Sequence, residues 1–135
     1  MPSEQETQQR ILLAHGSGPV RLFRNNVGTG WAGAATKIQR RGLVAVEPGD
    51  VVVRNARPLH SGLCVGSSDL IGYRRVGDLA QFVALEVKSA TGRTTPQQTA
   101  FLDHITAAGG CAGIVRSVED AREILRTGAK PEPIR

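Results

Sequence analysis

The chain has 135 residues and a formal net charge of +5, a length that suits a single domain with its own hydrophobic core. No apolar run reaches the roughly 20 residues that a membrane span needs, and the polar N-terminal segment lacks the apolar centre of a signal peptide. We therefore expect a soluble, intracellular protein with one domain over residues 1–135 and a tail from about residue 127.

The two cysteines, Cys64 and Cys111, lie in apolar, strand-like surroundings and lack the spacing of a zinc site. Thiols stay reduced in most intracellular compartments. We predict that both are buried free thiols, with a disulfide between them as the alternative.

A predicted helix followed by a short strand opens the chain. Ser3 and Glu6 have the spacing of a capping box, and Gly16 marks the end of the helix. The strand is predicted over Val20–Arg24. Glu4 lies in the first helical turn, where a carboxylate interacts favourably with the helix dipole. That structural role and a role in a functional site both remain open for Glu4.

Basic residues concentrate between positions 21 and 57. This segment holds seven basic and two acidic residues, a local balance of +5 that equals the net charge of the whole chain. Such a surface suits the phosphate backbone of a nucleic acid, and a solvated face without a partner is the alternative. The predicted contacts are Arg21, Arg24, Asn26, Lys37, Arg40, Arg41, Arg54 and Arg57.

The glycine-rich loop 28–33 lies within this basic segment and formally matches a dinucleotide-binding fingerprint. The sequence after it is too weakly periodic for the helix that such a site requires. A loop that approaches a nucleic-acid backbone and a plain surface loop both remain open. Further along, a hairpin is predicted from Leu43–Val46 and Asp50–Arg54, with Pro48 and Gly49 at its turn. Its core-facing residues would be among Val44, Val46, Val51 and Val53.

A second hairpin joins two strand-like runs, residues 69–75 and 79–88, through a Gly77-Asp78 turn. Glycine supplies the positive φ that a type II′ turn needs at its first position. If the turn has two residues, the register places Asp69 directly opposite Glu86. A longer turn would shift Asp69.

Glu86 and Lys88 lie two residues apart in the second strand of this hairpin, so they share one face. Opposite residues of paired strands have Cβ atoms about 5 Å apart, so the carboxylates of Asp69 and Glu86 repel unless a proton or a metal ion separates them. Two carboxylates without nearby His or Cys suit Mg²⁺ or Mn²⁺, and a lysine beside such an ion fits hydrolysis of a phosphodiester. The alternative is a simple buried ion pair between Glu86 and Lys88.

The C-terminal part is predicted to form a helix, a strand and a helix. Thr95 suits the N-cap and Gln98 the third position of a capping box, so Gln98 has a structural role besides a place at the mouth of the site. Residues expected to pack this helix on the sheet are Ala100, Phe101, Ile105 and Ala108. Cys111–Val115 is predicted as a strand parallel to the central one, and Val118–Leu125 as the last helix. The predicted fold class is α/β, with a mixed central sheet flanked by helices.

Three segments carry a specific pattern: GSSD at residues 66–69, LEVKSATGRTTPQQ at 85–98 and AAGGCAGIVRSVEDA at 107–121. In this order they resemble the virus-type replication-repair nuclease (VRR-NUC) domain of the PD-(D/E)XK nuclease superfamily. The resemblance extends to about Leu125 and departs at Ser68, where the superfamily usually has proline. It implies a restriction-endonuclease-like core in which the site residues are Asp69 and Glu86 as metal ligands, Lys88 as a catalytic residue, Gln98 as a supporting residue, and an N-terminal glutamate. The family pattern favours Glu4 for this last position, with Glu6 as the alternative.

We expect a Mg²⁺- or Mn²⁺-dependent DNA endonuclease. Asp69, Glu86 and the backbone carbonyl of Val87 would hold the ion, and Lys88 would position or polarise the attacking water. The resemblance further implies homodimers that act on branched DNA, such as four-way junctions, in replication, repair or recombination, in the cytoplasm of a bacterial or phage-infected cell. Two alternatives remain open: a non-catalytic basic DNA-binding module, and an RNA nuclease that uses the same site.

Overall fold

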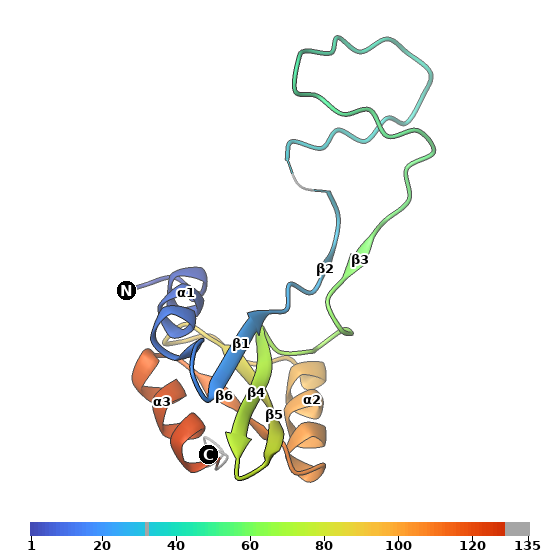
Figure 1. The fold of residues 1–135 in the computed structure, drawn as a ribbon. Helices are drawn as coiled ribbons and strands as arrows, with labels where there is room; N and C mark the ends of the chain where they lie inside the picture. The colour runs from blue at the N-terminus through green and yellow to red at the C-terminus, as the bar shows by residue number, and fades with distance from the viewer. Residues whose placement is uncertain (32, 129–135) are drawn as a thin grey trace.

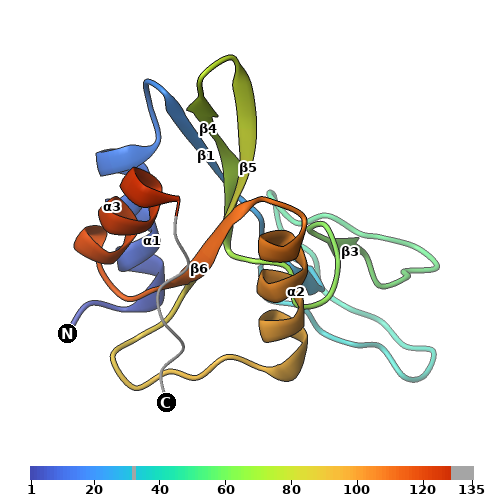
Figure 2. The ribbon, with the colours of Figure 1, turned by 90° about the horizontal axis from the view of Figure 1, so that it is seen from below.

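A four-stranded mixed sheet with helices on both faces forms the body of the protein in a computed structural model that describes residues 1–31 and 33–128. The elements are α1 (Glu4–His15), β1 (Val20–Arg24), β2 (Gly28–Thr29), β3 (His60–Ser61), β4 (Leu70–Val76), β5 (Leu79–Val87), α2 (Pro96–Ala107), β6 (Cys111–Val115) and α3 (Val118–Thr127). The strand order is β1-β4-β5-β6, with β6 parallel to β5 and the other pairs antiparallel. Helices α1 and α3 lie on one side of the sheet and α2 on the other, which confirms the predicted fold class (Figures 1 and 2).

Local capping signals determine where the helices begin and end. Ser3 caps α1 in a complete capping box with Glu6, and Gly16 ends that helix. Helix α3 continues to Thr127, two residues beyond the predicted end, and stops where Gly128 adopts a left-handed φ of 66°. Residues 129–135 of the predicted tail lie outside the described part of the chain. No helix in the described residues is long and apolar enough to span a membrane.

The β4–β5 hairpin has the predicted two-residue turn. Gly77 takes a φ of 60°, and Val76 pairs with Leu79. The same register pairs Leu70 with Leu85 at the other end of the hairpin. Continued by one residue, it places Asp69 opposite Glu86, as the sequence predicted.

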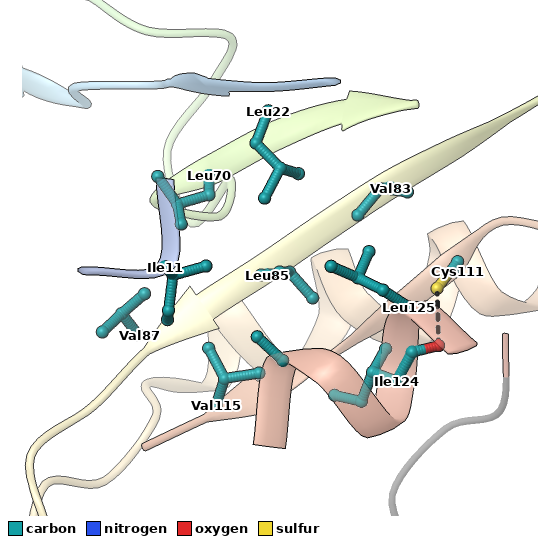
Figure 3. Packing of buried hydrophobic residues seen from close by; sticks show 11 residues of the cluster. Ile11, Leu22, Leu70, Val83, Leu85, Val87, Cys111, Val115, Ile124 and Leu125 are labelled. Carbon is teal, nitrogen blue, oxygen red and sulfur yellow. Dashed lines mark hydrogen bonds between the residues drawn. The ribbon is translucent and has the colours of Figure 1, made fainter. Parts of the chain in front are cut away.

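Apolar side chains fill both sides of the sheet. The larger cluster lies between the sheet and helices α1 and α3, where Ile11 and Ile124 meet Leu85 and Val115 (Figure 3). The smaller cluster lies under α2. Phe101 and Ile105 pack there as predicted, whereas Ala100 and Ala108 are exposed and Leu102 is the buried residue of the helix. The helix is therefore rotated relative to the predicted face.

The cysteine prediction is half right. Both thiols are free, and Cys111 is buried, with its Sγ 3.5 Å from the carbonyl oxygen of Ile124 (Figure 3). Cys64 is exposed instead of buried, because it lies in the irregular segment before β4 and not in a strand.

The predicted hairpin over residues 43–54 is not formed. Among the described residues, the segment between β2 and β3 contains a turn closed by the Asp50 N–H and the Glu47 carbonyl at 3.0 Å, but no strand. The described residues of this segment, 30, 31 and 33–59, project away from the body on the short β2–β3 pair (Figure 1), and we call them the arm. The supposed core residues Val44, Val46, Val51 and Val53 are 60% to 84% exposed. An isolated hairpin is marginal in water, and none of the described helices or strands packs against these valines.

Candidate active site

The candidate site lies at the edge of the sheet where β5 ends and β4 begins. Asp69 directly precedes β4, and its Oδ2 accepts a hydrogen bond of 2.8 Å from the backbone N–H of Val87. This bond fixes the Asp69 carboxylate against the last residue of β5.

Glu86 is the buried member of the carboxylate pair, with 1% of its surface exposed. Its Oε1 accepts a hydrogen bond of 2.6 Å from Gln98 Nε2 and lies 3.2 Å from Lys88 Nζ. Its Oε2 is buried and has no hydrogen-bond partner among the described residues. An unpaired carboxylate oxygen is costly in such surroundings, so this atom is available to a ligand.

The electrostatics of the pair favour a shared proton or a cation. Burial and then the negative charge of Asp69 raise the pKa of Glu86 to about 7, although Lys88 opposes this shift. Burial also raises the pKa of Asp69, and the charge of Glu4 adds to the rise, while the Val87 N–H and Lys88 oppose it. Two close carboxylates that resist joint ionisation can take up a divalent ion in place of the proton.

Gln98 combines the two roles that the sequence left open. Its Oε1 accepts from the Thr95 N–H at 2.9 Å in a complete capping box, and its Nε2 donates to Glu86. Because the Thr95 N–H binds the oxygen of the Gln98 amide, the NH₂ group of this amide faces the Glu86 carboxylate.

Glu4 and Glu6 have different surroundings. Oε1 of Glu4 accepts from the backbone N–H of Ser89 at 2.9 Å, one residue after Lys88. Glu6 instead accepts from the backbone N–H of Ser3 at 2.7 Å in the capping box of α1. Glu4 is therefore the N-terminal glutamate that the fold brings to the site.

A comparison with protein families identifies the family of the chain. A family model described as the VRR-NUC domain matches residues 5–119 of the 135. The chain belongs to the VRR-NUC family. It thereby has a PD-(D/E)XK-like nuclease fold and a nuclease-type function. No curated protein matches the chain. The family match begins one residue after Glu4, so it does not include this residue. The assignment of Glu4 to the candidate site therefore rests on its hydrogen bond with Ser89.

A buried amide that sequence reasoning did not assign to the site supports Asp69. Asn25 donates through Nδ2 to the Ser68 carbonyl at 2.9 Å and to Ser67 Oγ at 2.8 Å, and its Oδ1 accepts from the Leu63 N–H at 3.0 Å. Its own backbone N–H donates to the Asp69 carbonyl at 2.8 Å. Asn25 thus holds the segment that positions Asp69 in the candidate site of this VRR-NUC domain. A single sequence gives no signal for contacts that span about 40 positions.

The predicted nucleic-acid contacts are all exposed, but they divide into two groups. Arg24 lies in β1 opposite Leu70, one residue from Asp69, and Asn26 follows at the base of the arm. Arg21 lies further back in β1. The other five, Lys37, Arg40, Arg41, Arg54 and Arg57, lie on the arm itself. The arm therefore leaves the body at the same end of the sheet as the carboxylate pair.

No group of three or more His, Cys, Asp or Glu residues that could hold a metal ion occurs in the described residues. The candidate ligands of this VRR-NUC domain are two carboxylates, Asp69 and Glu86, and the backbone carbonyl of Val87. The unpaired Oε2 of Glu86 fits this oxygen donor set, because hard oxygen ligands suit Mg²⁺ or Mn²⁺.

Proposed function

We propose that this VRR-NUC domain is a Mg²⁺- or Mn²⁺-dependent DNA endonuclease that hydrolyses phosphodiester bonds. The single observation that carries the proposal is the state of Glu86. One of its oxygens is held by Gln98 and Lys88, while the other is buried without a donor among the described residues, beside a second carboxylate.

Asp69, Glu86 and the Val87 carbonyl would hold the ion. When bound, the ion would polarise the phosphate and neutralise its charge. The Val87 N–H holds the Asp69 carboxylate and Gln98 holds the Glu86 carboxylate, so both groups are fixed before an ion binds.

Lys88 adds a positive charge beside Glu86. Its side chain is 12% exposed, and its ammonium lies 3.2 Å from Glu86 Oε1. An amine held there can orient the attacking water and stabilise negative charge that develops on the phosphate. Glu4, bonded to the Ser89 N–H, supports the chain directly after Lys88.

The basic residues of β1 and of the arm would grip the phosphate backbone on both sides of the scissile bond. Arg24 and the base of the arm lie at the same end of the sheet as Asp69, which supports this assignment.

We further propose a homodimer that acts on branched DNA, such as a four-way junction. One carboxylate pair cuts one strand, and a junction offers two symmetric strands to a twofold dimer. The exposed apolar side chains of the arm, such as Leu43 and Val51, are of the kind that an assembly covers.

Plasmid nicking tests the proposal. The purified protein should nick supercoiled DNA with Mg²⁺ or Mn²⁺ and stop when EDTA is added, and Glu86→Gln should abolish cutting while salt-dependent DNA binding persists. Binding without cutting under every metal condition would instead support a non-catalytic module, in which Glu86 and Lys88 form only an ion pair. Linear duplex, single strand, flap, four-way junction and RNA, compared under one condition, identify the substrate.

A further inference from the structure

Ser89, the residue after Lys88, is held on both sides of its backbone by segments far away in the chain. Its N–H donates to Glu4 Oε1 at 2.9 Å. Its carbonyl accepts from Arg116 Nη1 and, at 3.2 Å, from the Gly92 N–H. The turn that follows the candidate active site is thus fixed by α1 on one side and by Arg116 on the other.

The parallel pairing of β5 and β6 explains why Arg116 reaches this turn. Val87 pairs with Val115, and the Lys88 N–H donates to the Val115 carbonyl at 3.0 Å. Arg116 therefore leaves the sheet at the same edge as Lys88. Its own backbone N–H donates to Asp120 Oδ2 at 2.8 Å, which anchors the half-buried arginine to the first turn of α3.

The turn fits closely around the Glu4 carboxylate. A Cβ atom on Gly92 would lie 2.9 Å from Ser89 Oγ and 3.1 Å from Glu4 Oε1, so only glycine fits there without a shift. Because the Ser89 N–H donates to Glu4 Oε1, a displacement of Ser89 would disturb the bond that holds the Glu4 carboxylate.

We propose that Arg116 is a positioning residue of the nuclease site. It holds the Ser89 carbonyl, and through Ser89 it fixes both the Glu4 carboxylate and the chain that leaves Lys88. The inference rests on the proposed nuclease function, but it concerns a residue that does not itself belong to the metal or water site.

Arg74 provides a matched control. It is also half-buried, and its guanidinium also donates to a backbone carbonyl, that of Leu125 at 3.0 Å, far from the carboxylate pair. Arg116→Ala should lower kcat for plasmid nicking by about tenfold or more and change KM for DNA by less than about twofold. Arg74→Ala should leave kcat close to that of the wild-type protein at temperatures well below its Tm.

Amide hydrogen exchange gives a readout that does not need cleavage. In Arg116→Ala the Ser89 amide should exchange about tenfold faster or more, because the turn that presents it to Glu4 is freed, whereas Arg74→Ala should leave its exchange unchanged. Arg116→Lys keeps the charge and one donor, so it should restore part of kcat and part of the protection of the Ser89 amide. If Arg116→Ala does not fold, Arg116→Lys is compared with Arg74→Ala in its place.

Unchanged Ser89 protection in the Arg116 variants would overturn the proposal, and so would an equal loss of kcat in Arg74→Ala. A wild-type protein that cuts no DNA would contradict the proposed function. The exchange comparison would still decide whether Arg116 positions Ser89.

Discussion

Gln98 and Glu86 meet at 2.6 Å between the amide Nε2 and the carboxylate Oε1, although one lies in α2 and the other in β5. The other end of the same amide accepts from the Thr95 N–H. The start of α2 and the orientation of the buried carboxylate are therefore set by one side chain. A change at Gln98 should affect stability and catalysis, and the two effects can be separated.

Gln98→Ala and Thr95→Ala each break the capping box of α2 and should each lower the free energy of unfolding by about 1 kcal/mol. Only Gln98→Ala also removes the donor from Glu86, so only this variant should lose nicking activity, by about tenfold to a hundredfold. Urea denaturation and nicking rates measure the two effects. Equal activity losses in both variants would show that Gln98 acts only as a cap of α2 and does not position Glu86.

Removal of one charge of the carboxylate pair should stabilise the metal-free protein while it abolishes cleavage. Asp69→Asn keeps an acceptor for the Val87 N–H and relieves the repulsion that raises the pKa of Glu86. We expect the free energy of unfolding to rise by about 1 kcal/mol at pH 8. Asp78→Asn, at the exposed turn of the β4–β5 hairpin, is the control and should change neither the free energy of unfolding nor the rate of DNA cleavage. A destabilised Asp69→Asn variant would show that the two carboxyls do not repel in solution.

Metal binding should depend on pH through Glu86. The pKa of Glu86 is raised from its ordinary 4.5 to about 7 in the folded protein, so the folded state keeps a proton that the unfolded chain has lost between these values. Stability of the metal-free protein should therefore fall as the pH rises through this window, by up to about 3 kcal/mol. Since a cation must displace the proton, Mn²⁺ should raise Tm more at pH 8 than at pH 6.

Thermal melts with Mn²⁺ and with EDTA at both pH values measure this effect. Glu86→Gln should remove both the fall in stability and most of the response to Mn²⁺. The same Mn²⁺-induced rise in Tm at both pH values, or in Glu86→Gln, would place the metal elsewhere.

The parts of the site that were predictable from the sequence depend on short-range rules. Gly77 at the first turn position determines the register of the β4–β5 hairpin. This register places Asp69 opposite Glu86, which lies 17 positions later in the sequence. The capping box at Thr95 placed Gln98 at the helix mouth in the same way. In both cases the signal lies within four residues, where local backbone geometry decides the outcome.

Other features depended on tertiary contacts that no short window contains. The valines of the arm have the composition of a hairpin, but such a pair forms only when another layer covers it. The rotation of α2, which buries Leu102 in place of Ala100, is set by how the helix meets Ala84 and Ala112. The role of Asn25 arises from three segments that meet only in the folded chain.

Asn25→Ala should be among the most destabilising single changes outside the apolar core. It leaves the Ser68 carbonyl and the Ser67 hydroxyl, both in buried residues, without the Asn25 amide, and each such loss costs about 1–3 kcal/mol. The N–H of the exposed Leu63 also loses its partner, but it can bond to water. We expect a loss of about 2–5 kcal/mol in the free energy of unfolding, measured by urea denaturation. Asn26→Ala, at the exposed neighbouring position, should change stability by less than about 0.5 kcal/mol. Equal effects at both positions would contradict the anchoring role of Asn25.

The arm should contribute to DNA affinity and hardly at all to stability. Its residues are exposed, so simultaneous replacement of Lys37, Arg40 and Arg41 by Gln should leave Tm nearly unchanged. If all three contact phosphates, the slope of log K against log salt should become shallower by about 2.7, because each contact contributes about 0.9. Fluorescence anisotropy at several salt concentrations measures that slope. Replacement of Arg75, Arg122 and Arg126, which are equally exposed but lie outside the arm, removes the same charge and controls for a general electrostatic effect. A similar change of slope in both triple variants would mean that net charge, and not the arm, determines DNA binding.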